Sequence, residues 1–360
     1  MKRARFTETC LIRRIAAMIA LAMIVLPGLS RAAESTGQLT KEQIAEGWIM
    51  PFDGETDYGW ATKGDCKTKI ADGALVCESG SGWLVTTTEF CDFVLKLQYR
   101  GDAKGIVAFG VPKDADPSKE GAKKEIAGKA GEWQDVDLKA EGARGFIAIQ
   151  CAPKLELRNV ILKPTNAKSI FNGKDLAGWK PLEGKYPSVF SVTPDGCLNI
   201  KNGPGDIQTE QQWKDFCCQL DIKSENPNPS KVLNSGVFFR AEPGKFWQGY
   251  EAQIRNEFKE NDRTKPVDFG TGAIYNRQAA RKVVSSENEW YTMTIIAAGN
   301  HLSTWVNGYQ TADYTDTNPP GSPRQNKSRT EAGVLSLQGH DPTTNMFFKN
   351  IRVEAYPEGK

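Results

Sequence analysis

A series of matching residues recurs along the chain and constrains its fold more than any other feature. The first four matches lie 119 positions apart: Phe52 with Phe171, Gly54 with Gly173, Gly59 with Gly178, and Trp60 with Trp179. Later matches keep their order while the offset grows to 188, where Gln150 is matched by Gln338. An ordered series of this kind is the signature of an internal repeat. We therefore predict a duplicated domain whose second copy is longer than the first.

The extra residues of the second copy fall mainly in two places. About 26 are gained between Gly236 and Glu289, a stretch that holds the runs GYEAQIR and GTGAIYN. About 31 are gained between Trp290 and Gly333, a stretch that holds the run HLSTWVNG. Most polar residues suited to chemistry lie in these gains, whereas the shared positions are apolar residues and turn glycines. This pattern favours a first copy that serves as scaffold and a second copy that carries the function.

Alternating polar and apolar residues run through both copies. Runs such as FVLKLQYR, CCQLDIKS and WYTMTIIAAG have the two-residue period of strands and are bounded by turn residues. Many short strands predict an all-β chain of two tandem β-sandwich or jelly-roll domains, at residues 33–163 and 168–360, with a linker at 164–167. A Thr-x-x-Gln capping box at Thr40 and Gln43 predicts one short helix over residues 41–46.

The first 32 residues have the features of a secretory signal peptide. Basic residues precede the apolar run 15–26, and Ser30-Arg31-Ala32 offers a cleavage site. The apolar run is shorter than the roughly 20 residues of a membrane-spanning helix. We therefore expect a periplasmic or extracellular protein without a membrane span.

The charge of the mature chain argues against nucleic acid as a partner. Removal of residues 1–32 takes six basic residues and one acidic residue from totals of 46 and 44, which leaves 40 and 43. A nearly neutral chain without a long basic run lacks the electrostatic footprint of a nucleic-acid-binding protein. A small uncharged partner such as a saccharide is favoured, and no pattern indicates an oligomeric state.

Seven cysteines remain after the predicted leader, so at least one is expected to stay unpaired. Cys66 and Cys77 flank the turn at Asp72-Gly73. A disulfide across this hairpin and a pair of buried free thiols are both open interpretations. No CxxC pair occurs and the chain has two histidines, which argues against a zinc site.

Strand-like runs between residues 234 and 275 carry the residues that we single out for chemistry. Alternation places Glu251 and Gln253 on one face of GYEAQIR, beside the run that carries Arg240. A carboxylate near a guanidinium stays ionised and accepts a proton, so Glu251 is a candidate base and Arg240 a candidate clamp for a carbonyl oxygen. Tyr275 offers a phenol or a stacking face. A cross-strand ion pair between Arg240 and Glu251, or a solvated sheet face, is the structural alternative.

Later runs add candidates for a sugar site. Trp305 and Asn307 share a face of HLSTWVNG and suit a sugar ring with its hydroxyls, although Asn307 followed by glycine is also a strong turn signal. Gln338 and His340 share the face of another run. The recurrence of Gln338 as Gln150 favours a structural role, whereas His340 has no match in the first copy and could serve as acid, base or ligand. Because one carboxylate stands out, a two-carboxylate glycosidase mechanism is weakly indicated.

The second copy resembles the 3-keto-disaccharide hydrolases, a family of secreted bacterial domains. The resemblance rests on FNGKDLAGW, NSGVFFR, GYEAQI, TGAIY, NEWYTMTI, WVNG, and LQGHDP followed by FFKNIRV. The first copy resembles the family only at its ends, through LTKEQIAEGWIMPFDG and RNVIL. The resemblance implies a concanavalin-like sandwich as a full member over residues 168–356 and a degenerate member over residues 46–163.

The activity implied by the resemblance is cleavage of glycosides whose C3 hydroxyl has been oxidised to a ketone. Such a ketone acidifies the C2 proton, so a base removes it, the C1 substituent leaves, and water adds back. With this chemistry, Glu251 is assigned as base, Arg240 and His340 as oxyanion or ligand groups, and Tyr275 and Gln253 as positioning donors. A divalent metal on Glu251 and His340 is also open. The rival interpretations are a lectin-like carbohydrate-binding module and a structural adhesion domain.

Overall fold

The computed structural model describes residues 38–358, except residues 103, 127–128, 143 and 229. The predicted signal peptide over residues 1–32 lies outside the described residues. The described chain is almost entirely β, as the sequence predicts. Its one α-helix, α1 (Lys41–Glu46), begins at the predicted capping box, where Thr40 and Gln43 each accept the other's backbone N–H. Within the described part, no helix has the length and hydropathy needed to cross a membrane.

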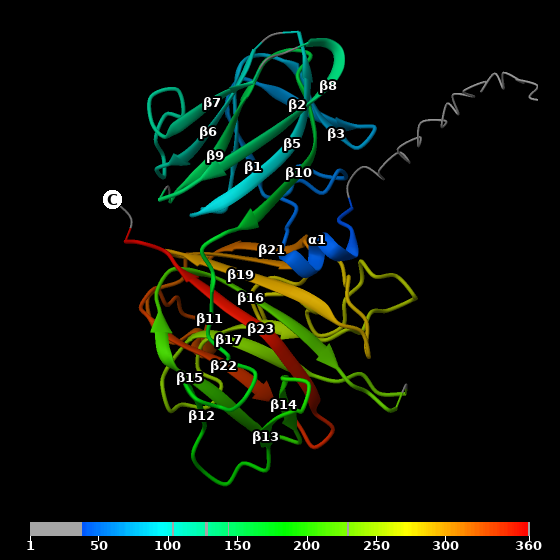
Figure 1. The fold of residues 1–360 in the computed structure, drawn as a ribbon, viewed down its shortest axis with the longest axis vertical. Coiled ribbons are helices and arrows are strands. Elements are labelled where there is room, and N and C mark those ends of the chain that lie inside the picture. Colours follow the sequence, from blue (N-terminus) through cyan, green and yellow to red (C-terminus); the bar gives the residue numbers. More distant parts are fainter. Residues whose placement is uncertain (1–37, 103, 127–128, 143, 229, 359–360) are drawn as a thin grey trace, which may run out of the picture. The chain divides into compact units, whose positions relative to one another are not determined.

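Residues 38–164, here called the first half, contain α1 and two antiparallel sheets of five strands (Figure 1). One sheet contains, in spatial order, β1 (Trp60–Gly64), β4 (Gly82–Thr86), β9 (Phe146–Cys151), β6 (Gly105–Val111) and β7 (Ala122–Ile126). The other contains β2 (Lys67–Ala71), β3 (Ala74–Ser79), β10 (Glu156–Pro164), β5 (Phe93–Gly101) and β8 (Lys129–Ala140). Alternate apolar residues such as Leu84, Leu95, Val107 and Ile149 form a common core.

Residues 168–355, the second half, form two further sheets (Figure 1). The smaller contains β12 (Trp179–Pro181), β15 (Gly205–Trp213), β22 (Gly333–Gly339), β17 (Ser235–Ala241) and β18 (Tyr250–Ile254). The larger contains β13 (Val189–Val192), β14 (Leu198–Lys201), β23 (Asn345–Ala355), β16 (Phe216–Ser224), β19 (Tyr291–Ala298), β20 (His301–Val306) and β21 (Tyr309–Thr315), with β11 (Lys168–Ser169) paired to β23. One 3-10 turn, η1, spans Pro323–Gln325.

The strand order of the first half recurs in the second. The order β12-β15-β22-β17-β18 repeats β1-β4-β9-β6-β7, and β13-β14-β23-β16-β19 repeats β2-β3-β10-β5-β8. The hairpin of β20 and β21 is an addition, as its sequence offset predicts. The predicted linker at 164–167 falls where β10 ends and before β11 begins. The division into two domains stays a prediction, since residues 36–360 cluster as one compact unit.

Two predicted features of the first insertion are wrong. The run GYEAQIR forms β18, which has a counterpart in β7, so it is not an added strand. The run GTGAIYN forms no named strand. It is joined to β18 by an isolated bridge between Ala252 and Ile274 and by backbone hydrogen bonds, among them Tyr275 N to Glu251 O at 2.9 Å and Gln253 N to Ala273 O at 3.1 Å. The inserted segment is therefore the loop over residues 255–290, which returns along the edge of β18.

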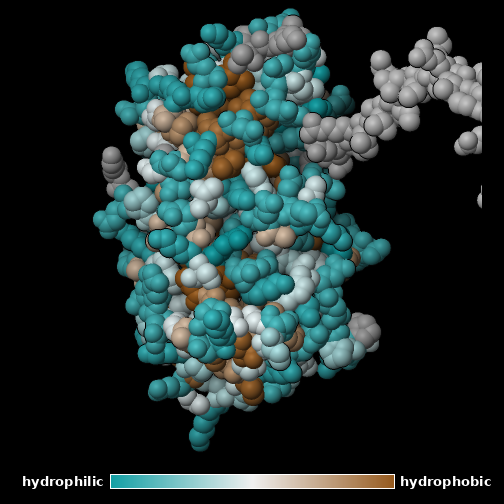
Figure 2. Space-filling model, viewed as in Figure 1, coloured by the Kyte–Doolittle hydropathy of each residue, from teal (hydrophilic) through white to brown (hydrophobic). Residues whose placement is uncertain are grey.

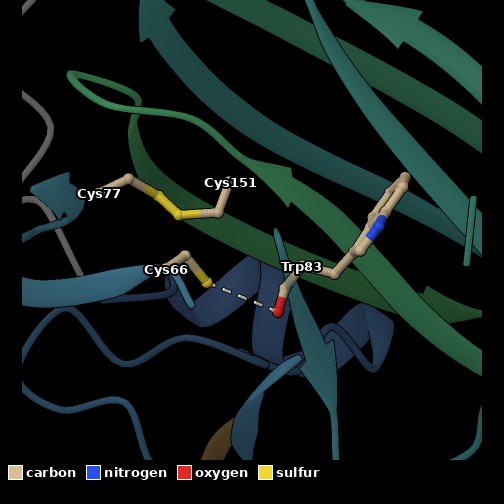
Figure 3. The surroundings of a disulfide bond; sticks show 4 residues. All are labelled: Cys66, Cys77, Trp83 and Cys151. Atoms are coloured by element: carbon tan, nitrogen blue, oxygen red, sulfur yellow. Dashed lines mark hydrogen bonds between the residues drawn. A yellow bond between two sulfur atoms is a disulfide. The ribbon is translucent and has the colours of Figure 1, made fainter. Parts of the chain in front are cut away.

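The disulfide of the first half differs from the predicted hairpin bridge (Figure 3). Cys77 on β3 is bonded to Cys151 at the end of β9, and this bond links the two sheets. In the β2–β3 register Cys77 lies opposite Thr68, so Cys66 is not across from it. The Cys66 thiol instead lies 4.0 Å from the Trp83 carbonyl. The free cysteines among the described residues are Cys66, Cys91, Cys197, Cys217 and Cys218, all buried, which confirms that some stay unpaired.

Polar side chains join the two halves. Arg144 of the first half pairs with Asp215 of the second at 2.8 Å, and Arg281 of the second pairs with Asp53 of the first at 2.9 Å. The face drawn in Figure 2 is mostly hydrophilic, with hydrophobic residues gathered mainly over the strands of the first half. The second half therefore presents the more polar surface on this face.

Candidate active site

The outer face of the β12-β15-β22-β17-β18 sheet carries two rows of side chains that cross four strands. The intervening residues, among them Ile207, Val237, Ala252 and Leu337, pack into the core. Because strand side chains alternate, the two rows face outward. From β15 to β18, the registers give Asp206, Gln338, Gly236 and Gln253 in the first row, and Gln208, Ser336, Phe238 and Glu251 in the second.

Unpartnered polar atoms concentrate over this face. Of nine buried side-chain atoms without a hydrogen-bond partner in the described residues, six lie here: Asp206 Oδ1, Asn234 Oδ1, Trp247 Nε1, Gln253 Oε1, Ser336 Oγ and Gln338 Oε1. Buried polar groups in folded proteins are nearly always paired. A cluster of unpaired donors and acceptors on one sheet face is therefore suited to a ligand that carries many polar groups.

Glu251 lies on β18 at the end of the second row. Its carboxyl group leans over Gly236, since a Cβ added to that glycine would lie 2.3 Å from Glu251 Oε1. Burial, together with the carboxylates of Asp268 and Asp206, raises the pKa of Glu251 to about 8. A carboxyl group with such a pKa can gain or lose a proton close to neutral pH, as a general acid or base requires.

A second carboxyl group, missed in the sequence, lies at the other end of the rows. Asp206 on β15 accepts the backbone N–H of Trp247 with Oδ2, 3.2 Å away. Burial raises the pKa of Asp206 to about 7. The alternation of GDIQTEQQW places Asp206 and Gln208 on one face, and this was the available signal. Nothing local in the sequence shows that β15 and β18 belong to the same sheet.

A column of four rings stands beside the rows. Ring centroids are separated by 4.7 Å between Tyr186 and Phe246, by 4.3 Å between Phe246 and Trp247, and by 5.8 Å between Trp247 and His340. Their planes lie within 22° of parallel. This stacking fixes Trp247, another residue that the sequence did not single out, with its Nε1 unpartnered.

A chain of hydrogen bonds links His340 to Gln253. His340 Nδ1 lies 2.9 Å from Asp341 Oδ2, and His340 Nε2 lies 3.2 Å from the Asn234 amide nitrogen. The same amide lies 3.4 Å from Asp268 Oδ2. Gln253 Nε2 in turn donates to the backbone carbonyl of Asp268 at 3.1 Å. The structure thus brings Gln253 and His340 to one site with a loop carboxylate, Asp268, that the sequence analysis did not choose.

A cavity of about 200 Å³ opens beside Glu251. Tyr275 also lines it, is 38% exposed and has its ring 5.1 Å from that of Phe269. Burial of the phenol and the nearby Asp268 raise the pKa of Tyr275. The cavity is lined by Phe238, Trp247, Gly249, Tyr250, Glu251, Tyr275, Asn276, Arg277, Pro323 and Arg324.

Arg240 does not reach this face, and its assignment to the site is wrong. The β17–β22 register shifts between Phe238 and Ala241, and Arg240 takes a left-handed φ of 47°. This bulge turns the side chain away from the rows. The guanidinium group is fully buried and donates to Asp215 Oδ1 at 2.8 Å and to the Lys214 carbonyl at 2.6 Å. Its third nitrogen also donates to backbone carbonyls, so Arg240 neither pairs with Glu251 nor remains free for a substrate.

Trp305 and Asn307 belong to the larger sheet, so their predicted place in the sugar site is also wrong. Trp305 is 1% exposed, packs 6.2 Å from the Phe90 ring and donates to the Met50 carbonyl. Asn307 occupies the turn between β20 and β21 with φ of 49°, as the turn signal predicted. Its side chain bonds two backbone groups, Thr292 N–H and the carbonyl of residue 284.

Glu251 and His340, which the sequence left open as metal ligands, are not in a three-residue set of close ligand atoms among the described residues. Among the described residues, one set of three His, Cys, Asp or Glu side chains has its ligand atoms within 4.8 Å of one another, namely Cys91, Asp92 and Glu354. Neither Glu251 nor His340 belongs to it.

The chain matches one protein family and is similar to several solved structures. The family of 3-keto-alpha-glucoside-1,2-lyase-like domains matches residues 47–127 and 166–354. Two crystal structures of candidate glycosyl hydrolases from Parabacteroides distasonis ATCC 8503 are similar to the chain. The first is 22% identical, with 53% of this chain and 94% of that chain covered and a TM-score of 0.43. The second is 26% identical, with 49% of this chain and 98% of that chain covered and a TM-score of 0.37. A carbohydrate-binding module from Bacillus subtilis is 17% identical over 51% of this chain and 99% of the module, TM-score 0.37.

None of the curated proteins compared with the chain matches it. The family match covers more than half of the chain, with its longer segment over the strands of the second half and its shorter one over part of the first. The chain therefore belongs to the carbohydrate-active family of 3-keto-alpha-glucoside-1,2-lyase-like domains.

Proposed function

We propose that the second half cleaves 3-keto-glycosides by C2 proton abstraction, elimination of the C1 substituent and hydration. One observation carries the proposal beyond family membership. Glu251, with a raised pKa, leans over a sheet face whose buried polar atoms lack partners. Sugar hydroxyls both donate and accept, so a pyranose ring matches such a face.

The first step transfers the C2 proton to the Glu251 carboxylate. The C3 ketone acidifies that proton, and the electron pair left on C2 moves onto the C3 oxygen as an enolate. With a pKa of about 8, ionised Glu251 is a stronger base than an ordinary carboxylate. The same raised pKa lowers the fraction of ionised Glu251, so only about a tenth of the molecules carry the ionised form at pH 7.

The negative charge on the C3 oxygen needs a hydrogen-bond donor. Trp247 Nε1–H is buried and makes no well-aligned hydrogen bond, although the Asp206 carboxyl group lies near enough for the indole to lower its pKa against the larger rise caused by burial, and the ring is held by stacking on Phe246 and His340. A donor fixed before the reaction stabilises an oxyanion without reorganisation. Trp247 thus takes the role that the sequence assigned to Arg240, and His340 supports the ring.

The second step breaks the bond from C1 to the leaving oxygen as the enolate collapses. Asp206, whose pKa is about 7, holds a proton in about half of the molecules at neutral pH and can give it to the leaving oxygen. Water then adds across the C1–C2 double bond, with hydroxide at C1 and a proton at C2. The products are the free 3-keto sugar and the released alcohol.

The test compares a 3-keto-glucoside with its unoxidised parent on the full chain. The proposal expects release of the alcohol from the ketone only, because only the ketone acidifies C2. Saccharide binding without release from either compound would contradict it and favour the lectin-like interpretation. Absence of both binding and release would favour a structural domain.

Export of the protein is part of the proposal. It is motivated by residues 1–32 and is supported by the Cys77–Cys151 disulfide, since disulfides persist mainly in oxidising compartments. Fractionation of cells that express the full chain would test it, and a product that retains residues 1–32 in the cytoplasm would contradict it.

A further inference from the structure

The cavity beside Glu251 differs in chemistry from the polar rows. Two of its hydrogen-bonding side chains already have partners: Asn276 Nδ2 donates to Asn326 Oδ1 at 2.9 Å, and Arg277 Nη2 donates to the carbonyls of Pro323 and Lys327 at 3.0 Å each. The rows, in contrast, hold four of the unpartnered atoms, whereas the cavity lining holds one, Trp247 Nε1. A sugar in the cavity would therefore find few free partners for its hydroxyls, and each hydroxyl left unpaired costs free energy.

Aromatic rings supply much of the remaining cavity wall. Phe238 belongs to its lining, Trp247 is fixed by the ring column, and Tyr275 keeps more than a third of its surface exposed. Aromatic rings attract other flat rings at centroid distances of about 4.5–7 Å. The guanidinium group of Arg324, an exposed residue, lies 5.9 Å from the Trp247 ring, where it places positive charge at the cavity edge.

We propose that this cavity is the leaving-group subsite and that it takes a flat aromatic aglycone in preference to a second sugar. The inference rests on the proposed function, because the proposed base, Glu251, belongs to both the polar rows and the cavity lining. Elimination from an aryl 3-keto-glycoside breaks the C1–O bond and releases a phenol or phenolate. Arg324 at the edge favours the anionic form of that product electrostatically.

The experiment measures binding without turnover. Phenyl α-D-glucoside, methyl α-D-glucoside and trehalose lack a C3 ketone, so the proposed elimination cannot consume them during calorimetric titration of the full chain. We expect phenyl glucoside to bind about tenfold more tightly than the other two, as one added ring contact predicts. Tyr275→Ala should remove this preference and Tyr275→Phe should keep it. Trp290→Ala, at an exposed aromatic residue outside the cavity, is the matched control and should keep it too.

The outcomes separate this inference from the proposed function. Equal affinity for the three glucosides, or a preference that survives Tyr275→Ala, would overturn the aromatic subsite. Cleavage of 3-keto-trehalose together with equal affinities would overturn the subsite and leave the proposed function intact. An aryl preference that depends on Tyr275, with no cleavage of phenyl 3-keto-glucoside, would support the aromatic cavity while the proposed function fails.

Discussion

The corresponding sheets of the two halves have the same strand order, but the side chains on their outer faces differ in polarity. In the second half the face consists of two largely polar rows that end at Glu251 and Gln253. In the first half the same positions form a largely apolar surface. From β4 to β7, its registers give Trp83, Gln150, Ile106 and Glu125 in one row, and Val85, Ala148, Ala108 and Lys123 in the other.

This difference shows that the sandwich and the site are separable properties of the chain. The interior residues of both sheets are apolar and specify the same strand order. The outward residues are free to differ, and the match retained between the polar positions of the two faces is Gln150 with Gln338. Because Gln150 lies in a face that lacks the other polar side chains, the shared glutamine is consistent with a structural role for Gln338. Among the described residues, Gln338 Oε1 nevertheless has no hydrogen-bond partner.

The first half also supports the loop that completes the site. Arg281 Nη2 donates to Asp53 Oδ2 at 2.9 Å, and its guanidinium lies 4.1 Å from the centroid of the Tyr58 ring. Gln278 Nε2 donates to the Tyr58 hydroxyl at 2.8 Å. These contacts hold the segment that follows Tyr275. The first half thus lacks the polar face and supports the loop of the second half.

The largest contrast is expected between Glu251 and its counterpart Lys123. Glu251→Gln should reduce kcat/KM for a 3-keto-glucoside by roughly 10³-fold, because it removes the proton acceptor and keeps the shape. Lys123→Gln, at the same strand position of the first half, should leave the rate unchanged. Steady-state release of the alcohol measures both. A Lys123 effect as large as that of Glu251 would show that the first face is also active.

The bulge residues of β17 and β6 provide the next contrast. Gly110 in the first half and Arg240 in the second both have left-handed φ, 64° and 47°. Arg240→Gly should keep the backbone and lower the free energy of unfolding by roughly 3 kcal/mol, because Asp215 and several carbonyls lose a buried partner. Denaturant unfolding measures the loss. Activity per folded molecule should not change. A large loss of activity at constant stability would instead indicate that Arg240 acts in the site.

Gly236 and Ile106 occupy equivalent positions in the first rows. Gly236→Ala places a Cβ 2.3 Å from Glu251 Oε1, so the carboxyl group must move. We expect kcat/KM to fall by roughly 10- to 100-fold, since small displacements of a catalytic group are costly. Ile106→Ala in the first half should have no effect on the rate. Unchanged activity of Gly236→Ala would argue that the position of Glu251 over the glycine is unimportant.

The pH dependence of cleavage is expected to show a smaller change. Glu251 must lose its proton to act as base, and Asp206 must keep one to protonate the leaving oxygen, so kcat/KM should pass through a maximum between about pH 7 and 8 and fall on both sides. The raised pKa also means that the folded chain binds this proton more tightly than the unfolded chain. The free energy of unfolding should therefore fall as pH rises from about 4.5 to 8, and Glu251→Gln should flatten that slope. A rate that keeps rising as the pH falls below 7 would contradict Glu251 as base.

The sequence could predict what depends on local periodicity. The two-residue period placed Glu251 with Gln253, the turn signal fixed Asn307, and the capping box fixed α1. It could not predict what depends on pairing between distant strands. Asp206 joins Glu251 only through the register of β15, β22, β17 and β18.

Two other failures have local causes that the sequence conceals. One bulged residue in β17 turns Arg240 from the site to Asp215, and alternation alone places it with Phe238. Trp305 alternates correctly on β20, but that strand belongs to the sheet whose face is buried against the first half. The two-residue period predicts on which face of a strand a side chain lies, but it does not predict which part of the protein covers that face.

The central claim is that Glu251 removes the C2 proton before the C1 bond breaks, and isotope incorporation tests it most directly. Cleavage of a 3-keto-glucoside in D2O, followed by NMR at early times against an enzyme-free control, should give a 3-keto sugar that carries deuterium at C2. Glu251→Gln should give neither release nor deuterium. Release of the alcohol with the original hydrogen retained at C2 would contradict the account, because direct hydrolysis at C1 would then explain the activity.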